Sequence, residues 1–226
     1  MCESVTDGAV RQIVSPTFAA FAESTGRLLP EQNFCGLPMN ELERVALALL
    51  KPNRVAHVLG CRDTAVAMAQ RWGANETDAA RAALLHDVTK ALDVAGQLTL
   101  PGEYGMILDE FSKNYPKTLH ALTGSLVAQY VFGEKPAVVQ AIRYHTTGRA
   151  DMTLLEKIIY VADYMEPNRD FPGVEKLREL AFSDLDKALH LGLTMTLEVL
   201  LKQGSEVSPE SREALAWLET KGTIEI

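Results

Sequence analysis

The sequence has little cysteine, and its cysteines are scattered. Cys2, Cys35 and Cys61 are the 3 cysteines among 226 residues, and no C-x-x-C pair occurs. An odd number of dispersed cysteines is typical of reduced thiols in a cytosolic protein. The first residues, MCESVTDGAV, also lack the basic and apolar regions of a signal peptide. We therefore expect a cytoplasmic protein.

Long apolar runs and an excess of positive charge are missing too. No apolar stretch approaches the roughly 20 residues needed to span a membrane. The formal net charge of -8 argues against binding DNA or RNA as a polymer, because such proteins usually present a basic surface. A small anionic substrate remains compatible with this charge, since a local site can be positive on an acidic protein.

The sequence also lacks a convincing alternating strand pattern, and helical punctuation dominates. Residues 93–116 contain several prolines and glycines, which predict a looser connection with a short helix around 103–113. The prediction is an all-α fold. We expect its helices over residues 40–50, 52–73, 75–92, 117–133, 136–148, 153–165, 174–182, 183–203 and 209–219.

Several of these helices carry start and stop signals. Gly73 and Gly133 are placed to end helices, and Pro136 is placed in a first turn. Three ranges open with the spacing of a capping box, namely Asn40 with Glu43, Asn75 with Asp78, and Thr153 with Glu156.

The chain contains no internal repeat, no low-complexity segment and no clear linker. Residues 1–40 are the least readable part, with one or two short helices broken at Pro16 and then a loop. We therefore expect one helical domain over residues 41–226, preceded by an N-terminal extension of unknown role.

Histidines extend the apolar faces of separate predicted helices. A single histidine on a helix is more often structural than a ligand, and His190 in the C-terminal part is interpreted in that way. The other four form a set on different helices, as a site built between packed helices requires. On the helix of His120, Gly124 is a small residue that would allow close approach of a neighbour. These four residues are His57, His86, His120 and His145.

The stretch AALLHDVTK, residues 82–90, places two metal-capable groups side by side at the end of an apolar run. Buried imidazoles and carboxylates are costly unless they are paired or bound to a metal. Imidazole together with carboxylate suits iron, manganese, cobalt or zinc. His86 and Asp87 can converge on one ion, and His57 and Asp163 would complete a mixed nitrogen and oxygen shell.

Basic residues lie near these candidate ligands. Arginine forks match phosphate oxygens, and lysine supplies a point charge. Arg54 is one turn before His57 and Lys90 is one turn after His86, which favours a function for both. Arg143 is interpreted as a solvated helix end. Arg149 and Arg169 are also within a few residues of candidate ligands.

The order His57, His86-Asp87, Asp163 resembles the H…HD…D signature of the HD-domain metal-dependent phosphohydrolases. The resemblance extends further, to the bacterial YqeK family of symmetrical bis(5'-nucleosyl)-tetraphosphatases, which cut diadenosine tetraphosphate into two ADP. It covers about residues 41–220, and the block at 143–173 is specific to this family. The matching stretches are LLHDVTK, HALTGSLVA, AIRYHTTGRADMTLLEKIIYVADYMEPNRDFPGV and LRELAFSDLDKAL.

The resemblance implies a single HD-domain helical bundle with a metal site between its helices. It implies iron as the metal, and a homodimer is a family expectation. His120 and His145 could instead bind a second ion, so one or two ions remain open. By position, the metal ligands are His57, His86, Asp87 and Asp163, and the residues around phosphates and nucleotide are Arg54, Lys90, His120, His145, Thr146 and Arg169.

A mechanism for phosphoanhydride hydrolysis follows from these positions. His57, a ligand, also lies beside the substrate. Arg54, Lys90 and Arg169 would neutralise the polyphosphate, while His120 or His145 would protonate the leaving ADP. Asp163 or Asp87 would position the attacking water. The EPNRDFPG loop could act as a lid or contact the base through Asn168, or could serve only to stop a helix.

Other readings stay open from the sequence. One is an HD phosphohydrolase that acts on a nucleoside triphosphate, a monophosphate or an alarmone. Another is a nucleotide-binding regulator without turnover, although a complete ligand set argues against it.

Overall fold

The computed structural model describes residues 12–26 and 32–220. Cys2, the sequence MCESVTDGAV and part of the predicted loop before residue 39 lie outside these ranges. The described residues form helices and their connections, with no β-strand among them. This confirms the predicted all-α class. The described residues fall into two compact units.

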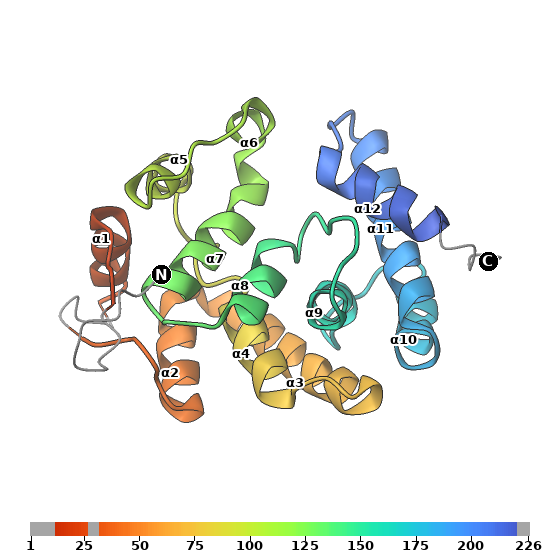
Figure 1. Ribbon diagram of the computed structural model, residues 1–226, viewed down its shortest axis with the longest axis horizontal. Helices are drawn as coiled ribbons and strands as arrows, with labels where there is room; N and C mark the ends of the chain where they lie inside the picture. The colour runs from red at the N-terminus through yellow and green to blue at the C-terminus, as the bar shows by residue number, and fades with distance from the viewer. Residues whose placement is uncertain (1–11, 27–31, 221–226) are drawn as a thin grey trace. The chain divides into compact units, whose positions relative to one another are not determined.

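The first unit comprises the described residues of Met1–Val55 and Leu84–Arg143. Its helices α7 and α8 lie side by side, and α5 packs against α7 (Figure 1). Helix α7 is the centre of this unit, because all its residues up to Ala128 are buried. The unit contains α1 (Pro16–Ser24), α2 (Met39–Leu49), the short 3₁₀ helix η1 (Pro52–Arg54), α5 (Val94–Glu103), α6 (Glu110–Asn114), the short 3₁₀ helix η2 (Pro116–Thr118), α7 (Leu119–Tyr130) and α8 (Pro136–Arg143).

Helix α1, from the predicted N-terminal extension, packs against α5. Ser15 caps its first turn, and the Ser15 N–H donates to the Tyr104 hydroxyl at 3.3 Å. The Thr17 hydroxyl donates to the Glu103 carboxylate at 2.8 Å. The described part of the extension therefore belongs to the first unit. Its role, and the boundary expected after residue 40, stay predictions.

The second unit comprises Ala56–Ala83 and the described residues of Tyr144–Ile226. Helix α11 packs against α9, α10 and α12 (Figure 1). The Trp72 indole N–H donates to the Ala181 carbonyl at 2.8 Å, which ties α3 to α10. The unit contains α3 (Val55–Trp72) without its first residue, α4 (Glu76–Leu85) without its last two, α9 (Leu154–Met165), α10 (Val174–Ser183), α11 (Leu185–Lys202) and α12 (Pro209–Thr220).

Helix α9 carries the core of the second unit. Ile158, Ile159 and Val161 are fully buried in it. The Tyr160 ring is buried as well, and this burial raises the pKa of its hydroxyl, which lies 3.4 Å from the Thr196 hydroxyl. The Tyr160 hydroxyl is therefore neutral at ordinary pH, and its ring packs in this core.

The capping predictions were confirmed at two of three helices. Thr153 and Glu156 form the full capping box of α9. The Asn75 side chain accepts from the Asp78 N–H at 2.9 Å, as expected for an N-cap. The prediction for Asn40 was wrong, because α2 begins one residue earlier, at Met39, after Pro38. Proline has a fixed φ, here -62°, and it starts the helix without a side-chain cap.

Two other helix predictions were wrong in extent. Residues 93–116 contain two helices, α5 and α6, where one around 103–113 was expected. Each begins at an aspartate, Asp93 or Asp109, whose side chain accepts a hydrogen bond from an N–H of its first turn. The helix expected over 136–148 ends at Arg143 and continues as turns.

The helix expected over 75–92 also ends early, at Leu85. Beyond it, the Val88 N–H donates to the Leu85 carbonyl at 3.2 Å, three residues back, and tight turns follow. The Thr89 carbonyl accepts instead from the Gln97 side chain at 2.7 Å. Tertiary hydrogen bonds thus replace those of a helix, and His86 and Asp87 lie in a turn.

Gly124 brings α7 close to this turn. A Cβ atom at Gly124 would lie 3.3 Å from the His86 carbonyl oxygen and 3.5 Å from Ile142. This agrees with the expectation that a small residue here allows close approach. No helix among the described residues has both the length and the apolar character that a membrane crossing demands.

Replacing Ile158 by alanine is expected to destabilise the protein by about 2–5 kcal/mol, because it leaves a cavity in the packed face of α9. Leu154→Ala, on the same helix, is the matched control, since Leu154 is 39% exposed. Urea unfolding followed by circular dichroism measures both. Equal losses for the two variants would contradict this description of α9.

Candidate metal centre

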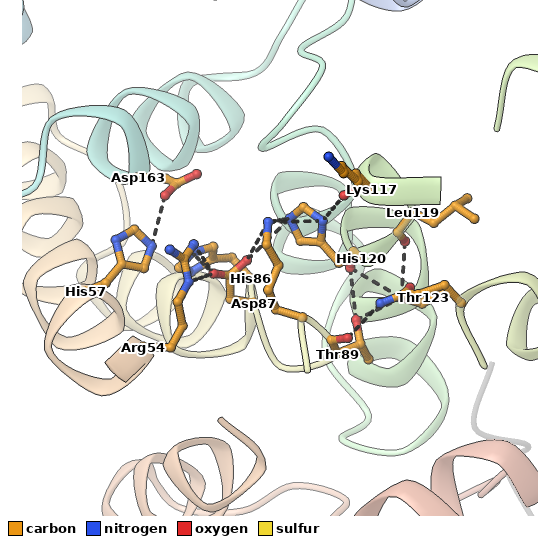
Figure 2. A network of polar contacts seen from close by, with 12 residues as sticks. Arg54, His57, His86, Asp87, Thr89, Lys117, Leu119, His120, Thr123 and Asp163 are labelled. Atoms are coloured by element: carbon orange, nitrogen blue, oxygen red, sulfur yellow. Dashed lines mark hydrogen bonds and ion pairs between the residues drawn. The ribbon is translucent and has the colours of Figure 1, made fainter. Parts of the chain in front are cut away.

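The first unit contains a cluster around Asp87, which follows α4 directly. The Asp87 carboxylate is 1% exposed. Its Oδ2 atom accepts from Arg54 Nε at 2.6 Å and also pairs with Nη2 of the same guanidinium (Figure 2). His86 Nε2 lies 3.6 Å from the same oxygen. The buried charge of Asp87 is therefore balanced by Arg54, which makes two contacts with the carboxylate, and the His86 imidazole lies beside this pair.

His120, from the first turn of α7, lies against the other oxygen of Asp87. His120 Nε2 is 3.3 Å from Asp87 Oδ1 and 2.9 Å from Lys90 Nζ. His120 Nδ1 is 2.9 Å from the Lys117 carbonyl, which can only accept (Figure 2). The proton of neutral His120 is therefore on Nδ1, and Nε2 accepts from the Lys90 ammonium.

A network of buried hydroxyl groups lies next to this cluster. The Thr89 hydroxyl donates to the His120 carbonyl at 3.0 Å and lies 2.8 Å from the Thr123 hydroxyl (Figure 2). Thr123 in turn donates to the Gln97 side chain at 2.7 Å. The network fixes the turn that carries Asp87 and Lys90 against α7.

A cavity of about 320 Å³ opens beside Lys90 and His120 within the first unit. Its charged lining residues are Lys90 and Lys117, and no carboxylate lines it among the described residues. Leu92, Val94 and Pro116 supply apolar walls. A positive cavity with an apolar side suits a phosphate group joined to a nucleoside.

The second unit contains a cluster around His57, in the first turn of α3. His57 Nε2 lies 3.0 Å from Asp163 Oδ1 (Figure 2). On the other side of the ring, Nδ1 lies 3.1 Å from Glu166 Oε1. Glu166 is 1% exposed and follows α9 directly. The imidazole is therefore held between a ligand-type carboxylate and a buried one.

Arg169 and Asn168 complete this second cluster. Arg169 donates through Nη2 to Asp163 Oδ1 at 2.8 Å and through Nε to the Asp163 carbonyl at 2.9 Å. Asn168 donates to Glu166 Oε2 through its N–H at 2.7 Å and its side-chain amide at 2.8 Å. Each carboxylate beside His57 thus has its own positively charged or amide donors.

Glu166 was missed by the sequence reasoning. A signal was available, because Glu166 stands three residues after Asp163 at the end of the same apolar helix, where i and i+3 side chains share a face. An acidic residue on that face is hard to explain as a solvated surface group.

The structure brings most of the predicted residues together within their own units. His145 and Thr146 follow α8, in the second unit; His145 is 2% exposed, and no described residue hydrogen-bonds the buried Thr146 hydroxyl. Arg149 pairs with the buried Glu156 at 3.0 Å, which is a structural contact. The first cluster gathers Arg54, His86, Asp87, Lys90 and His120, and the second gathers His57, Asp163, Asn168 and Arg169.

His190 lies on α11 and is part of neither cluster. It is 8% exposed, and its Nε2 atom is 3.9 Å from the Glu219 carboxylate in the same unit. Cys35 and Cys61 form no disulfide bond among the described residues.

Comparison with known proteins matches this chain to the HD domain over residues 54–168. The chain therefore belongs to the HD-domain family. The match contains every residue of both clusters except Arg169, and the imidazole and carboxylate groups in them are of the kind that holds a divalent metal.

Within that family the chain belongs to the YqeK-type enzymes. It is 38% identical over 183 residues to the symmetrical bis(5'-nucleosyl)-tetraphosphatase of Bacillus subtilis, covering 80% of this chain and 98% of the relative. It is 41% identical over 171 residues to the enzyme of the same name from Halalkalibacterium halodurans, covering 74% and 91%.

A solved structure is similar along most of the chain. The crystal structure of a predicted HD superfamily hydrolase involved in NAD metabolism, from Clostridium acetobutylicum, has a TM-score of 0.79 and 34% sequence identity. The similarity covers 82% of this chain and 98% of that one.

Thr89→Val keeps the shape of the side chain but removes the donor that holds the His120 carbonyl. We expect it to lower stability by about 1–2 kcal/mol, the net worth of a buried hydrogen bond. Thr118→Val is the control, because the Thr118 hydroxyl bonds only within its own turn, to the Tyr115 carbonyl. Chemical unfolding compares the two. A smaller loss for Thr89→Val than for Thr118→Val would argue against the network.

Proposed function

We propose that this protein hydrolyses diadenosine tetraphosphate symmetrically to two ADP, using a divalent metal. The observation that supports the proposal is the pair of clusters, in which the H…HD…D residues of a YqeK-type chain lie beside the side chains of Arg54, Lys90 and Arg169. The names of the two bacterial relatives supply the substrate.

The proposed metal ligands are His57 and Asp163 from the second unit, with His86 and Asp87 from the first. Their side chains fit a metal, because each offers an imidazole nitrogen or a carboxylate oxygen in a largely water-excluded place. His57 is 6% exposed, His86 0% and Asp87 1%. This donor set suits iron, with manganese, cobalt and zinc as alternatives. The proposal takes one ion as the minimum, and a second would draw on His120 and His145.

When bound, such a metal polarises a phosphoryl oxygen and lowers the pKa of a water molecule toward neutrality. The chain's own cations would do the rest of the charge neutralisation. Arg54 and Arg169 carry planar forks for phosphate oxygens, and Lys90 faces the 320 Å³ cavity. Asp163 or Asp87 would orient the attacking water.

The leaving ADP needs a proton, and His120 or His145 is proposed to supply it. His120 Nδ1 lies 2.9 Å from the Lys117 carbonyl, so Nε2 is the nitrogen that would face the leaving group. Asp87 Oδ1 at 3.3 Å and Lys90 Nζ at 2.9 Å both lie beside Nε2 and would orient the ring.

Thr146 and Asn168 are proposed as nucleotide contacts. The buried Thr146 hydroxyl has a donor and an acceptor to offer, and the Asn168 side chain carries an amide that could bond a base. A cytoplasmic location, a homodimer and the absence of a nucleic-acid partner stay predictions.

A second candidate is an HD phosphohydrolase for another nucleotide, which the NAD-related name of the Clostridium acetobutylicum structure favours. A panel of dinucleotides, nucleoside triphosphates and monophosphates separates the two by relative kcat/KM. A nucleotide-binding regulator would bind members of the panel without turnover.

His86→Ala is expected to abolish turnover and to reduce bound metal to less than about a tenth, because a lost ligand removes most of the site's affinity. His190→Ala is the matched control, since it deletes a buried histidine outside both clusters. Metal content after anaerobic loading and turnover are both measured. Unchanged metal and turnover in His86→Ala would overturn the proposed ligand set.

Lys90→Ala is expected to lower kcat/KM about 10- to 100-fold, the worth of a charge-assisted bond to phosphate, with metal content retained. Lys113→Ala is the control, because Lys113 is an exposed lysine paired with Glu110 at 2.6 Å. Steady-state kinetics on diadenosine tetraphosphate measures kcat/KM for both variants. Equal kcat/KM values for the two variants would refute a phosphate role for Lys90.

A further inference from the structure

We infer that Glu166 is a positioning residue that fixes His57 as a metal ligand by accepting the proton on Nδ1 in a hydrogen bond. This inference rests on the proposed metal site. It adds a residue outside the H…HD…D signature and assigns the loop after α9 a role in positioning a metal ligand.

The geometry of the His57 ring carries the first step. Its Nδ1 lies 3.1 Å from Glu166 Oε1, and its Nε2 lies 3.0 Å from Asp163 Oδ1. Each ring nitrogen therefore faces a carboxylate, which can only accept. If His57 and Asp163 hold one ion, Nε2 must direct its lone pair to that ion, so the ring proton must be on Nδ1, where Glu166 accepts it. Ligand histidines usually donate their other N–H in this way.

The Glu166 carboxylate is itself held in one orientation. Asn168 donates to Oε2 twice, through its backbone N–H and its side-chain amide. The same amide also donates to the Ala56 carbonyl at 3.1 Å, beside His57 on α3. Oε1 is therefore left facing the imidazole. If Glu166 served only in packing, its two oxygens would not need separate partners, Asn168 for Oε2 and His57 for Oε1.

Gly60 provides the space for this carboxylate. A Cβ atom at Gly60 would lie 2.5 Å from Glu166 Oε2 and 3.0 Å from Asn168 Nδ2. Any larger residue must push the carboxylate away from its position, because Asn168 holds the same oxygen. Gly60 stands one turn after His57 on α3, so the helix that carries the ligand also makes room for its partner.

The loop backbone around Glu166 is anchored independently of the metal site. Arg178 donates through Nη2 to the Glu166 carbonyl at 3.0 Å and to the Arg169 carbonyl at 2.8 Å. Because the backbone is fixed from α10, a change at the Glu166 side chain alters the bond to His57 without releasing the loop. Glu166→Gln is therefore a narrow test.

Glu166→Gln is expected to lower Fe²⁺ affinity about 10- to 100-fold, the usual effect of removing a partner of a ligand histidine. The affinity is measured anaerobically by competition with a colorimetric chelator. Glu156→Gln is the matched control, because Glu156 is also a buried carboxylate of α9 but bonds Arg149 and its own capping box. Gly60→Ala should lower the affinity as well, with Glu166 intact. Equal Fe²⁺ affinities for Glu166→Gln and Glu156→Gln would overturn the inference.

A second measurement needs no metal. The ¹⁵N shifts of the His57 ring in the metal-free protein report how its proton is shared between the two nitrogens. The inference requires a larger Nδ1–H population in the wild type than in Glu166→Gln. Equal Nδ1–H populations in the two proteins would overturn it. If the wild type bound no Fe²⁺, the proposed function would fail, while the ¹⁵N shifts would still decide the role of Glu166.

Discussion

A buried carboxylate is costly unless donors surround it, and this constraint organises both clusters. Asp87 pairs with Arg54, which is 33 residues away in the sequence, and Glu166 pairs with His57, which is 109 residues away. Each pair therefore joins two segments that are distant in the sequence. The Asp87 and Glu166 carboxylates are each 1% exposed, whereas the arginine and lysine side chains beside them stay partly exposed.

The turn after α4 shows how the fold provides partners for buried polar groups. Had the helix continued to residue 92, His86 and Asp87 would sit on neighbouring helical positions with their backbone groups satisfied locally. Instead Thr89 bonds to α7 and to α5, and Gly124 lets α7 come close. The turn therefore places Lys90 next to His120 of α7, and both residues line the 320 Å³ cavity.

Sequence patterns were enough for the helical class and for the capping of α9, because these depend on local spacing and on the chemistry of single residues. The candidate ligands rest on the same kind of pattern and stay a prediction. They were not enough for the end of α4, which depends on tertiary hydrogen bonds of Thr89. Glu166 was missed although its spacing of three residues from Asp163 was a local signal. That spacing places Glu166 near Asp163, but the orientation of its carboxylate depends on tertiary contacts with Asn168 and Gly60.

The most direct test of the account is anaerobic turnover of diadenosine tetraphosphate by the purified protein with ferrous iron, with the products resolved by chromatography. The account predicts ADP as the only nucleotide product. AMP together with ATP would show hydrolysis at a different phosphorus and contradict symmetrical cleavage. Absence of any product from protein with confirmed metal content would contradict the proposed activity itself.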